Sequence, residues 1–223
     1  MKPNDLSHQY DPLADTFEAV LDKGNRVSRG AFRDALPSLE GKSVLDIGCG
    51  EGSDCAFYLE SGAKMVSGLD ASKELLEKAK NKYPGIDFQY GVFEKIPFGD
   101  NKFDIVLSKY ALMTSDDLEP IFSEVDRVLK PNGIFIFLVT HPIRQFYEKK
   151  KAGKDYFKKE IVDSVCFDGA LIFKEPTHTL KEYFSPFLLS KFTLEGYDEQ
   201  FDPAAEKIVD IYPGFSIFKW LKR

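Results

Sequence analysis

The sequence predicts an α/β fold in which helices flank a mostly parallel sheet, and three observations support this prediction. Val44, Leu45 and Ile47 form a short apolar run, which is typical of a strand buried on both faces of a parallel sheet. Alternating glycines follow this run and lead into a helical segment, and further strand-like and helical segments alternate as far as residue 139. With 223 residues, 43% of them hydrophobic, the chain has the length of one domain with a substantial core.

The N-terminal residues 10–36 are amphipathic and read as two or three short helices. Phe17 and Leu21 share one helical face, whereas Gly24 and Gly30 interrupt the pattern. Packing against the edge of the sheet is sufficient to explain such helices.

The loop after the first strand is rich in glycine, which allows a ligand to approach its backbone. Asp46 closes the strand, and three glycines, beginning with Gly48 and Gly50, stand at alternate positions. Glycine permits a sharp turn and has no Cβ to block a ligand. We expect a helix to follow at Asp54–Leu59, with Ser53 as its N-cap, and the free N–H groups there favour an anionic or carboxylate-bearing ligand. A tight turn that binds no ligand is the alternative.

Two classes of nucleotide-like ligand bind to a strand, glycine loop and helix of this kind. The dinucleotide fingerprint Gly-x-Gly-x-x-Gly would need a glycine at Ser53, so a nicotinamide-dependent oxidoreductase fits poorly. The pattern present is Asp-x-Gly-x-Gly-x-Gly, which resembles motif I of the class I methyltransferases that use S-adenosylmethionine (SAM). This resemblance implies that Asp46, Gly48, Cys49 and Gly50 contact the cofactor.

The second expected strand, Lys64–Leu69, is followed at its carboxyl end by Asp70. A carboxylate at this place can accept both hydroxyls of a ribose, and such charged hydrogen bonds are worth about 1.5–3 kcal/mol each. The alternative is a strand-end acid that caps the next helix, which Ser72 opens and which we expect at Lys73–Lys82. The resemblance favours the ribose role for Asp70, with Ala71 beside it.

After a third expected strand at residues 86–90, Gly91–Phe98 resembles the adenine loop of the same family. The family usually reads Gly-Asp-Ala-Glu-x-Leu-Pro-Phe, whereas this chain reads Gly-Val-Phe-Glu-Lys-Ile-Pro-Phe. Val92 therefore replaces the acid that bonds the adenine amino group. The resemblance leaves the Phe93 backbone N–H to face an adenine nitrogen and places Glu94 in the cofactor site.

The fourth and fifth expected strands are Phe103–Ser108 and Ile134–Val139. Their carboxyl ends should lie at the edge where open α/β sheets bind their ligands. We therefore expect Ser108 in the cofactor site, and Tyr110 and Met113 in the site of the methyl acceptor.

His141 follows the fifth strand directly and is the candidate catalytic residue. A histidine pKa near 6.5 suits proton transfer at neutral pH, so His141 could orient the acceptor or take its proton. The alternative is a histidine that hydrogen-bonds a neighbouring loop beside Pro142. Tyr183 is expected to join Tyr110 in contacting the acceptor.

The segment 143–178 is rich in lysine and aromatic residues but has no clear period. We expect residues 143–195 to form a lid or substrate insertion. The aromatic residues suggest a small aromatic or apolar acceptor, although ordinary hydrophobic packing would also account for them. A sixth strand is expected from Gly196, and a seventh, antiparallel one at Phe215–Trp220.

The resemblance is carried mainly by residues 40–142 and implies a single methyltransferase domain over residues 1–223. Its Rossmann-like sheet would have seven strands in the order 3-2-1-4-5-7-6, with strand 7 antiparallel. Residues 1–40 would form a helical cover over SAM. In that cover Tyr10 would close the pocket, and Arg29 would meet the methionine carboxylate.

The activity implied by the resemblance is methyl transfer from SAM, leaving S-adenosylhomocysteine (SAH), to an O or N atom of a small, aromatic or apolar metabolite. In such an in-line displacement the protein mainly holds the acceptor and the methyl group about 3 Å apart. A SAM-binding protein without activity, acting as a partner or regulator, is the alternative.

Composition restricts the partners further. A net charge of −6 argues against a nucleic-acid partner, which needs a basic surface. The three cysteines and three histidines lack metal-ligand spacing, so no metal is expected. No secretory signal and no apolar stretch of membrane-spanning length is evident, so we expect a cytoplasmic protein, either monomer or homodimer, with no membrane partner.

Overall fold

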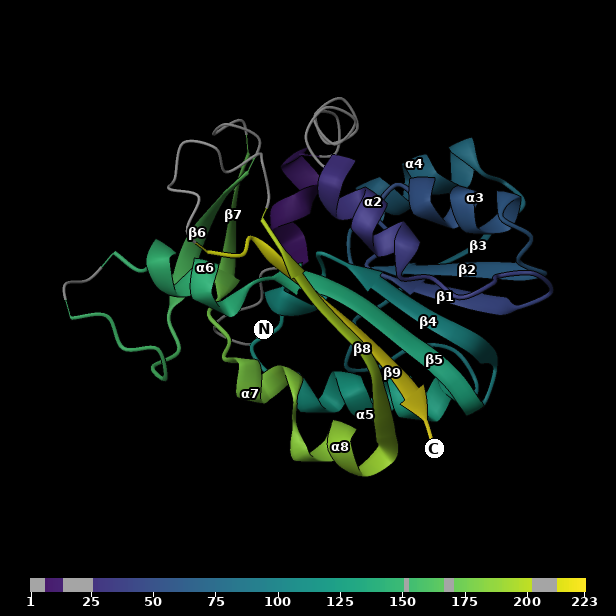
Figure 1. The fold of residues 1–223 in the computed structure, drawn as a ribbon. Helices are drawn as coiled ribbons and strands as arrows, with labels where there is room; N and C mark the ends of the chain where they lie inside the picture. Colours follow the sequence, from purple (N-terminus) through teal and green to yellow (C-terminus); the bar gives the residue numbers. More distant parts are fainter. Residues whose placement is uncertain (1–6, 14–25, 151–152, 167–170, 202–211) are drawn as a thin grey trace.

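The computed structural model describes residues 7–13, 26–150, 153–166, 171–201 and 212–223. Its centre is a seven-stranded sheet with the order β3-β2-β1-β4-β5-β9-β8 (Figure 1). Strands β1 to β5 pair in parallel, and β9 pairs antiparallel with β5 and β8. The bounds are β1 (Ser43–Ile47), β2 (Met65–Asp70), β3 (Asp87–Tyr90), β4 (Phe103–Lys109), β5 (Leu129–Thr140), β8 (Phe192–Gln200) and β9 (Phe215–Lys222). Counted within this sheet, the order is 3-2-1-4-5-7-6, which confirms the expected fold.

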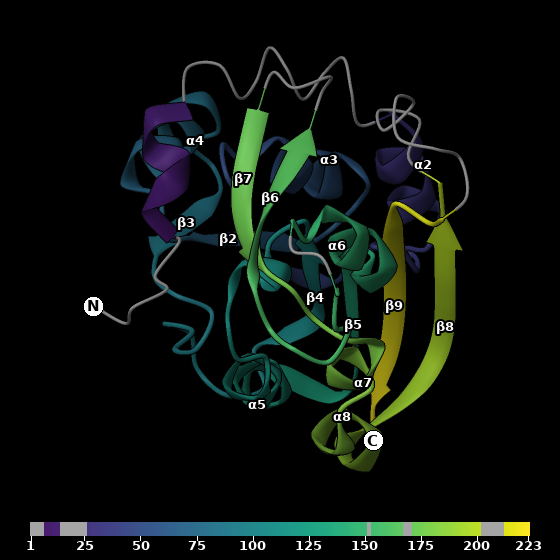
Figure 2. The same cartoon turned by 90° about the vertical axis from the view of Figure 1, so that its left-hand side faces the viewer.

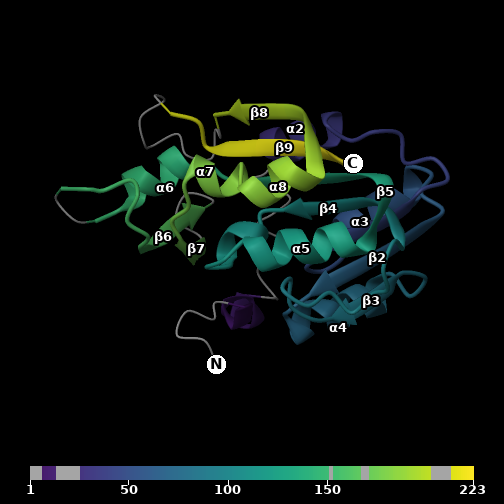
Figure 3. The same ribbon diagram turned by 90° about the horizontal axis from the view of Figure 1, so that it is seen from below.

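Helices cover both faces of the sheet (Figure 3). One face carries α2 (Arg26–Asp34), α3 (Ser53–Glu60) and α4 (Lys73–Lys82). The other face carries α5 (Glu119–Val128), α7 (Leu180–Tyr183) and α8 (Pro186–Lys191). None of the helices in the described ranges has the length and hydropathy of a membrane span.

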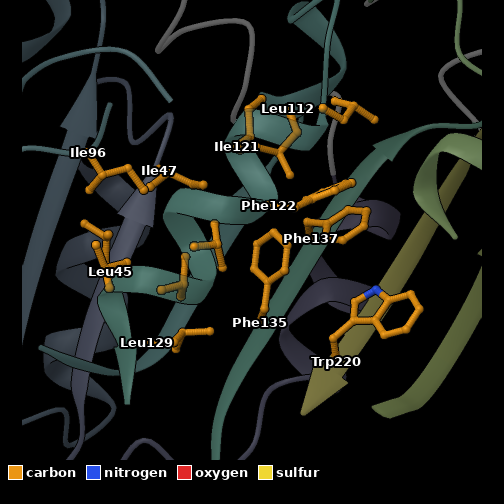
Figure 4. Packing of buried hydrophobic residues seen from close by; sticks show 14 of the residues in the cluster. Leu45, Ile47, Ile96, Leu112, Ile121, Phe122, Leu129, Phe135, Phe137 and Trp220 are labelled. Carbon is orange, nitrogen blue, oxygen red and sulfur yellow. The ribbon is translucent and has the colours of Figure 1, made fainter. Parts of the chain in front are cut away.

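The core between β5, β9 and α5 is aromatic. Phe122, Phe135, Phe137 and Trp220 meet there and are fully buried (Figure 4). The ring centroids of Phe135 and Phe137, two residues apart on one face of β5, lie 4.9 Å from each other. Truncating a buried phenylalanine to alanine typically costs about 3–5 kcal/mol. This layer therefore stabilises the packing of α5 on β5 and β9.

One helix start differs from the sequence-based expectation, and another agrees with it. Helix α3 has Gly52 as its N-cap, in a left-handed conformation with φ +83°, so the expectation of Ser53 is wrong. Helix α5 begins at Glu119, and Pro120 in its first turn has no N–H that would need a partner. Ser72 caps α4 as expected, and its side chain accepts the N–H three residues further on at 3.2 Å.

Residues 143–178 contain more regular structure than their sequence indicates. After α6 (Pro142–Glu148), the strands β6 (Ile161–Cys166) and β7 (Leu171–Pro176) form a separate antiparallel hairpin (Figure 2). On β7, Leu171 and Glu175 are buried, whereas Ile172 and Lys174 are exposed. This alternation is typical of a strand, but the glutamate on its buried side masks the pattern in the sequence.

The described part of the N-terminal cover consists of the 3-10 helix η1 (Ser7–Leu13) and of α2. Phe32 of α2 is buried against the sheet, on the apolar face that the sequence indicates. Phe17, Leu21 and Gly24 lie outside the described residues.

Candidate functional site

The loop between β1 and α3 has left-handed backbone at each of its alternating glycines. Gly48, Gly50 and Gly52 have φ values of +80°, +54° and +83°. A Cβ at Gly48 would overlap the Cβ of Ala111, whereas a Cβ at Gly50 would meet no atom closer than 4.0 Å. Glycine at position 48 therefore allows close packing, and glycine at position 50 leaves an open stretch of backbone. Such a cradle fits a nucleotide-like cofactor.

Asp70 at the end of β2 ties the glycine loop to the neighbouring strand. Its Oδ2 accepts the Gly50 N–H, and its Oδ1 accepts the Ser72 N–H, each at 2.8 Å. Burial raises the pKa of the Asp70 carboxyl, although these backbone N–H groups oppose the rise. A carboxylate oxygen has a second lone pair, so both oxygens can still accept a ligand hydroxyl.

Asp46 lies at the buried end of β1, behind the glycine loop. It is 3% exposed, and its Oδ2 accepts from the Cys55 Sγ at 3.6 Å. Burial, and then the nearby charge of Asp54, raise the pKa of Asp46 to about 7, while Lys109 opposes the rise. Burial likewise raises the pKa of the Cys49 thiol in the loop to about 11, so this thiol stays protonated at neutral pH.

The expected adenine loop lies beside the glycine loop. The Phe93 ring comes within 3.6 Å of the position that a Gly48 Cβ would occupy. Val92 is 43% exposed, and the Glu94 carboxylate accepts the Ser115 hydroxyl at 3.1 Å. The structure therefore brings the two predicted cofactor loops together.

Ala71 and Ser108 lie at the ends of β2 and β4 respectively. Ala71 is partly exposed between Asp70 and the start of α4. The buried Ser108 hydroxyl donates to the Ile47 carbonyl at 2.9 Å, so its proton already bonds the neighbouring strand.

The N-terminal cover and the hairpin are in direct contact. Tyr10 of η1 stacks on Phe173 of β7, with ring centroids 5.2 Å apart. Asp11 accepts the hydroxyl of Ser72 at 2.5 Å, next to Asp70. Arg29 lies half-buried on α2, on the face of the sheet that also carries α3 and α4.

His141 lies where the sequence predicts, directly after β5, and both of its ring nitrogens have partners. Nδ1 accepts the Ile143 N–H at 3.0 Å as the N-cap of α6, and Nε2 lies 3.0 Å from Oε2 of Glu199. Because Nδ1 accepts, the ring proton of the neutral form is at Nε2 and is donated to Glu199. Burial lowers the pKa of His141, although Glu199 opposes this. Neither nitrogen is free in this arrangement to take a proton from an acceptor.

The expected acceptor residues gather near the carboxyl end of β5. Met113, in the 3-10 helix η2 (Leu112–Thr114), offers its carbonyl to Nε2 of His178 at 3.2 Å. The Tyr183 ring packs against His178 and Phe137, and its buried hydroxyl has no hydrogen-bond partner among the described residues. Tyr110 adopts a left-handed φ of +53°, which is strained for a non-glycine residue and turns the chain sharply after β4.

A buried polar group beside these residues is not evident from the sequence. It consists of Thr140, Gln145 and Glu175, together with the backbone of His178. The one sequence signal for this group is a glutamate, Glu175, at a position that is buried in the strand. It can be recognised only after β7 is known to be a strand.

Comparisons with known sequences agree with this geometry. A family model described as a methyltransferase domain matches residues 45–137. An uncharacterized methyltransferase of Synechocystis sp. is 44% identical over 103 residues, covering 45% of this chain and 48% of the relative. A demethylmenaquinone methyltransferase of Lactococcus lactis is 33% identical over 190 residues, covering 81% of this chain and 69% of the relative. The chain spans from 48% to 64% of the length of the first curated relatives that it matches.

A solved structure extends the similarity to nearly the whole chain. The crystal structure of an S-adenosylmethionine-dependent methyltransferase from Mesorhizobium loti superposes with a TM-score of 0.74 and 25% sequence identity. The superposition covers 91% of this chain and 100% of that one.

Proposed function

The chain belongs to the class I SAM-dependent methyltransferases, and from this premise we propose that it methylates a small, hydroxylated aromatic acceptor. The sequence predicts an O or N atom as the methyl acceptor. The similarity to a relative from Desulfotalea psychrophila that is named as a C-methyltransferase of ubiquinone and menaquinone biosynthesis adds carbon as a third kind of acceptor atom.

The observation that carries the cofactor part is the pair of backbone bonds at Asp70. These bonds fix the open backbone of Gly50 beside a carboxylate that has further lone-pair capacity for a ligand hydroxyl. In the proposed arrangement Asp70 accepts the ribose hydroxyls, Gly48, Cys49 and Gly50 line the methionine side, and Phe93 faces the adenine. Bound SAM supplies a methyl group on a positively charged sulfur.

We assign supporting roles to the other predicted residues. Ala71 and Glu94 flank the nucleoside, and Asp46 and Ser108 hold the strand ends behind it. Tyr10 closes the cover, and Arg29 meets the methionine carboxylate. Residues 1–40 and 143–195 serve as the two covers of a single domain.

The acceptor part rests on the aromatic and polar groups beside the glycine loop. Ala111 packs on Gly48. Met113 and Tyr183 lie nearby, and both contact His178. An aromatic ring can pack against Tyr110 and Met113, while the Tyr183 hydroxyl can bond an acceptor oxygen. The protein then lowers the activation barrier of methyl transfer by aligning the acceptor with the methyl group, an effect that alone can account for several kcal/mol.

Transfer of tritium from [methyl-³H]SAM to a panel of hydroxylated arenes tests this function. We expect incorporation with 1,4-naphthohydroquinone, kept reduced, and none with its control 1,4-dimethoxynaphthalene, which has no acidic hydroxyl. Tandem mass spectrometry then places the methyl group on oxygen or carbon.

The same panel separates the alternative functions. Tight binding of SAH without transfer to any arene would favour a regulatory SAM-binding protein. Thermal stabilisation by NAD instead of SAH would contradict the cofactor assignment.

A further inference from the structure

Glu175 is buried at a position where the strand pattern calls for an apolar residue. It lies on the inward side of β7 and is 1% exposed. Among the described residues, no basic nitrogen pairs with it within 4.0 Å. Burying a carboxylate without an ion-pair partner is costly, so its presence here calls for an explanation.

Hydrogen bonds hold the Glu175 carboxylate in one orientation but leave one of its oxygens weakly engaged. Oε1 accepts the side-chain N–H of Gln145 at 2.9 Å. Gln145 is itself fixed, because its own oxygen accepts the His178 N–H at 2.8 Å. Within the part of the chain that the structure describes, Oε2 has only the Thr140 hydroxyl at 3.4 Å, which is a long contact for an O–H donor.

The charged groups around Glu175 come from helices α6 and α7. Burial is the largest influence and raises the pKa of Glu175 to about 7; Glu148 adds to the rise and Arg144 opposes it. On α7, burial and then the nearby charge of Glu175 raise the pKa of the Tyr183 phenol. The ring of His178 is directed elsewhere, toward Met113 and Glu182. The carboxyl can therefore lose and regain a proton near neutral pH.

A chain of contacts links Glu175 to the loop assigned to the cofactor. Gly48 packs on Ala111, and η2 follows immediately, with β7 packed against it. His178, just after β7, bonds the Met113 carbonyl of η2. The glycine loop, η2 and the inward side of β7 therefore form a continuous series in which each packs against the next.

We propose that Glu175 is the general base of the methyl transfer and that Tyr183 is the hydrogen-bond donor to the acceptor. This inference rests on the proposed function, because it requires an acceptor with an acidic hydroxyl. The acceptor proton moves to Oε2 of Glu175 as the acceptor oxygen, or the ring carbon beside it, bonds the methyl carbon. The methyl–sulfur bond breaks, and its electron pair stays on the sulfur of SAH. If carbon is methylated, the ring then loses its own proton to water and regains aromaticity.

The test compares the parent with Glu175→Gln, which has the same shape but cannot take a proton. Glu148→Gln is the matched control, because Glu148 is also a largely buried acid with a raised pKa. Turnover is measured from pH 5.5 to 9 with [methyl-³H]SAM and reduced 1,4-naphthohydroquinone. Calorimetry in two buffers of different ionisation enthalpy counts the protons exchanged when that probe binds the SAH complex.

The expected result is a fall of about 10²- to 10⁴-fold in kcat for Glu175→Gln, with SAH affinity within about twofold. The rise in rate around pH 7, and the proton exchange on binding, disappear in this variant. In Glu148→Gln both persist, with the rise in rate shifted to lower pH because Glu148 no longer raises the pKa of Glu175. Unchanged kcat and pH profile in Glu175→Gln would overturn the inference while leaving the function in place. If Glu175→Gln does not fold, Glu175→Asp replaces it; its shorter side chain withdraws the carboxylate from the acceptor, so an unchanged kcat there would equally count against the base. A parent that neither binds nor methylates the probe would refute the acceptor class, and the base with it.

Discussion

The side-chain amide of Gln9 pairs with the backbone of Lys174 in both directions. Its Nε2 donates to the Lys174 carbonyl at 3.0 Å, and its Oε1 accepts the Lys174 N–H at 2.8 Å. A glutamine from η1 thus takes the place of a neighbouring strand along the edge of β7. The N-terminal cover and the hairpin are thereby joined beside Asp70, where Asp11 of the same helix bonds Ser72.

Gln9→Ala should loosen both covers, because it removes two hydrogen bonds, each worth about 0.5–1.5 kcal/mol. We expect amides of residues 7–13 and 171–176 to exchange hydrogen about tenfold faster. Hydrogen exchange read by mass spectrometry measures this, and Gln200→Ala, on the edge strand β8 of the seven-stranded sheet, is the control. Equal exchange in the two variants would mean that the covers hold without Gln9.

The adenine loop offers a test by gain of an interaction. Val92 is 43% exposed, so an aspartate there is tolerated and can accept the adenine amino group. Val92→Asp should keep or tighten SAH affinity, by up to about tenfold, whereas the uncharged control Val92→Ala should change it little. Titration calorimetry gives both values. A large loss in a folded Val92→Asp protein would place the adenine elsewhere.

His141 is predicted to act on stability more than on chemistry. His141→Ala should lower the free energy of unfolding by about 2–3 kcal/mol, because it removes a helix N-cap and a buried hydrogen bond. His141→Asn, which can still cap α6, should recover part of this loss and keep kcat within a few-fold. A fall of about 10²-fold or more in its kcat would make His141 the base instead of Glu175.

The same histidine gives stability a pH dependence of known sign. The pKa of His141 is lowered in the folded protein, so below pH 6.5 the unfolded chain binds the proton more readily. Stability should therefore fall as pH drops from about 6.5 toward the folded pKa, and fall less in His141→Asn. Denaturant unfolding at several pH values follows this difference.

Asp46 should give a pH dependence in the opposite direction. Its pKa is raised from 3.8 to about 7 in the folded protein, which therefore holds the proton more tightly than the unfolded chain. Stability from this group is lost as pH rises from about 4 to 7, and Asp46→Asn should remove that loss. The melting temperature of Asp46→Asn relative to the parent should then rise by about 5 °C between pH 5 and 8.

Asp104 provides the contrast, because ion pairing with Lys130 and bonds from Ser43 hold its pKa at about 2 despite some desolvation. Its stabilisation is present above pH 3.8 and is lost as pH falls toward 2. The difference in melting temperature between Asp104→Asn and the parent should therefore stay constant between pH 5 and 8. Parallel melting curves for Asp46→Asn and the parent over this range would contradict the assigned state of Asp46.

The positions of the strands and of the glycine loop could be predicted from the sequence because local signals specify them, whereas the order of the strands in the sheet followed from the resemblance to the methyltransferase family. Apolar runs and alternating glycines are properties of neighbouring residues, and so is the Ser72 cap. The N-cap of α3 was harder to predict, because Gly52 both ends the glycine loop and caps the helix. The sequence shows a serine in a favoured position but not the left-handed turn before it.

The acceptor side could be predicted only in outline, because its contacts join distant segments. His141 meets Glu199 across 58 positions, and Gln145 meets Glu175 across 30. The position of His141 in the sequence correctly indicates that it lies at the carboxyl edge of the sheet, but it does not indicate which groups bond its ring nitrogens. Glu175 is inconspicuous among many charged residues until the hairpin shows that it faces inward.

The central claim is that the glycine loop and Asp70 together bind the nucleoside of SAM, and the affinity of Asp70→Ala for SAH tests it most directly. Asp87→Ala, on the neighbouring strand β3, is the control, and circular dichroism verifies that both variants are folded. Loss of the charged ribose bonds, worth about 2–4 kcal/mol, should weaken SAH binding by about 30- to 1000-fold in titration calorimetry. The control should remain within about twofold of the parent. An unchanged dissociation constant in folded Asp70→Ala would contradict the account.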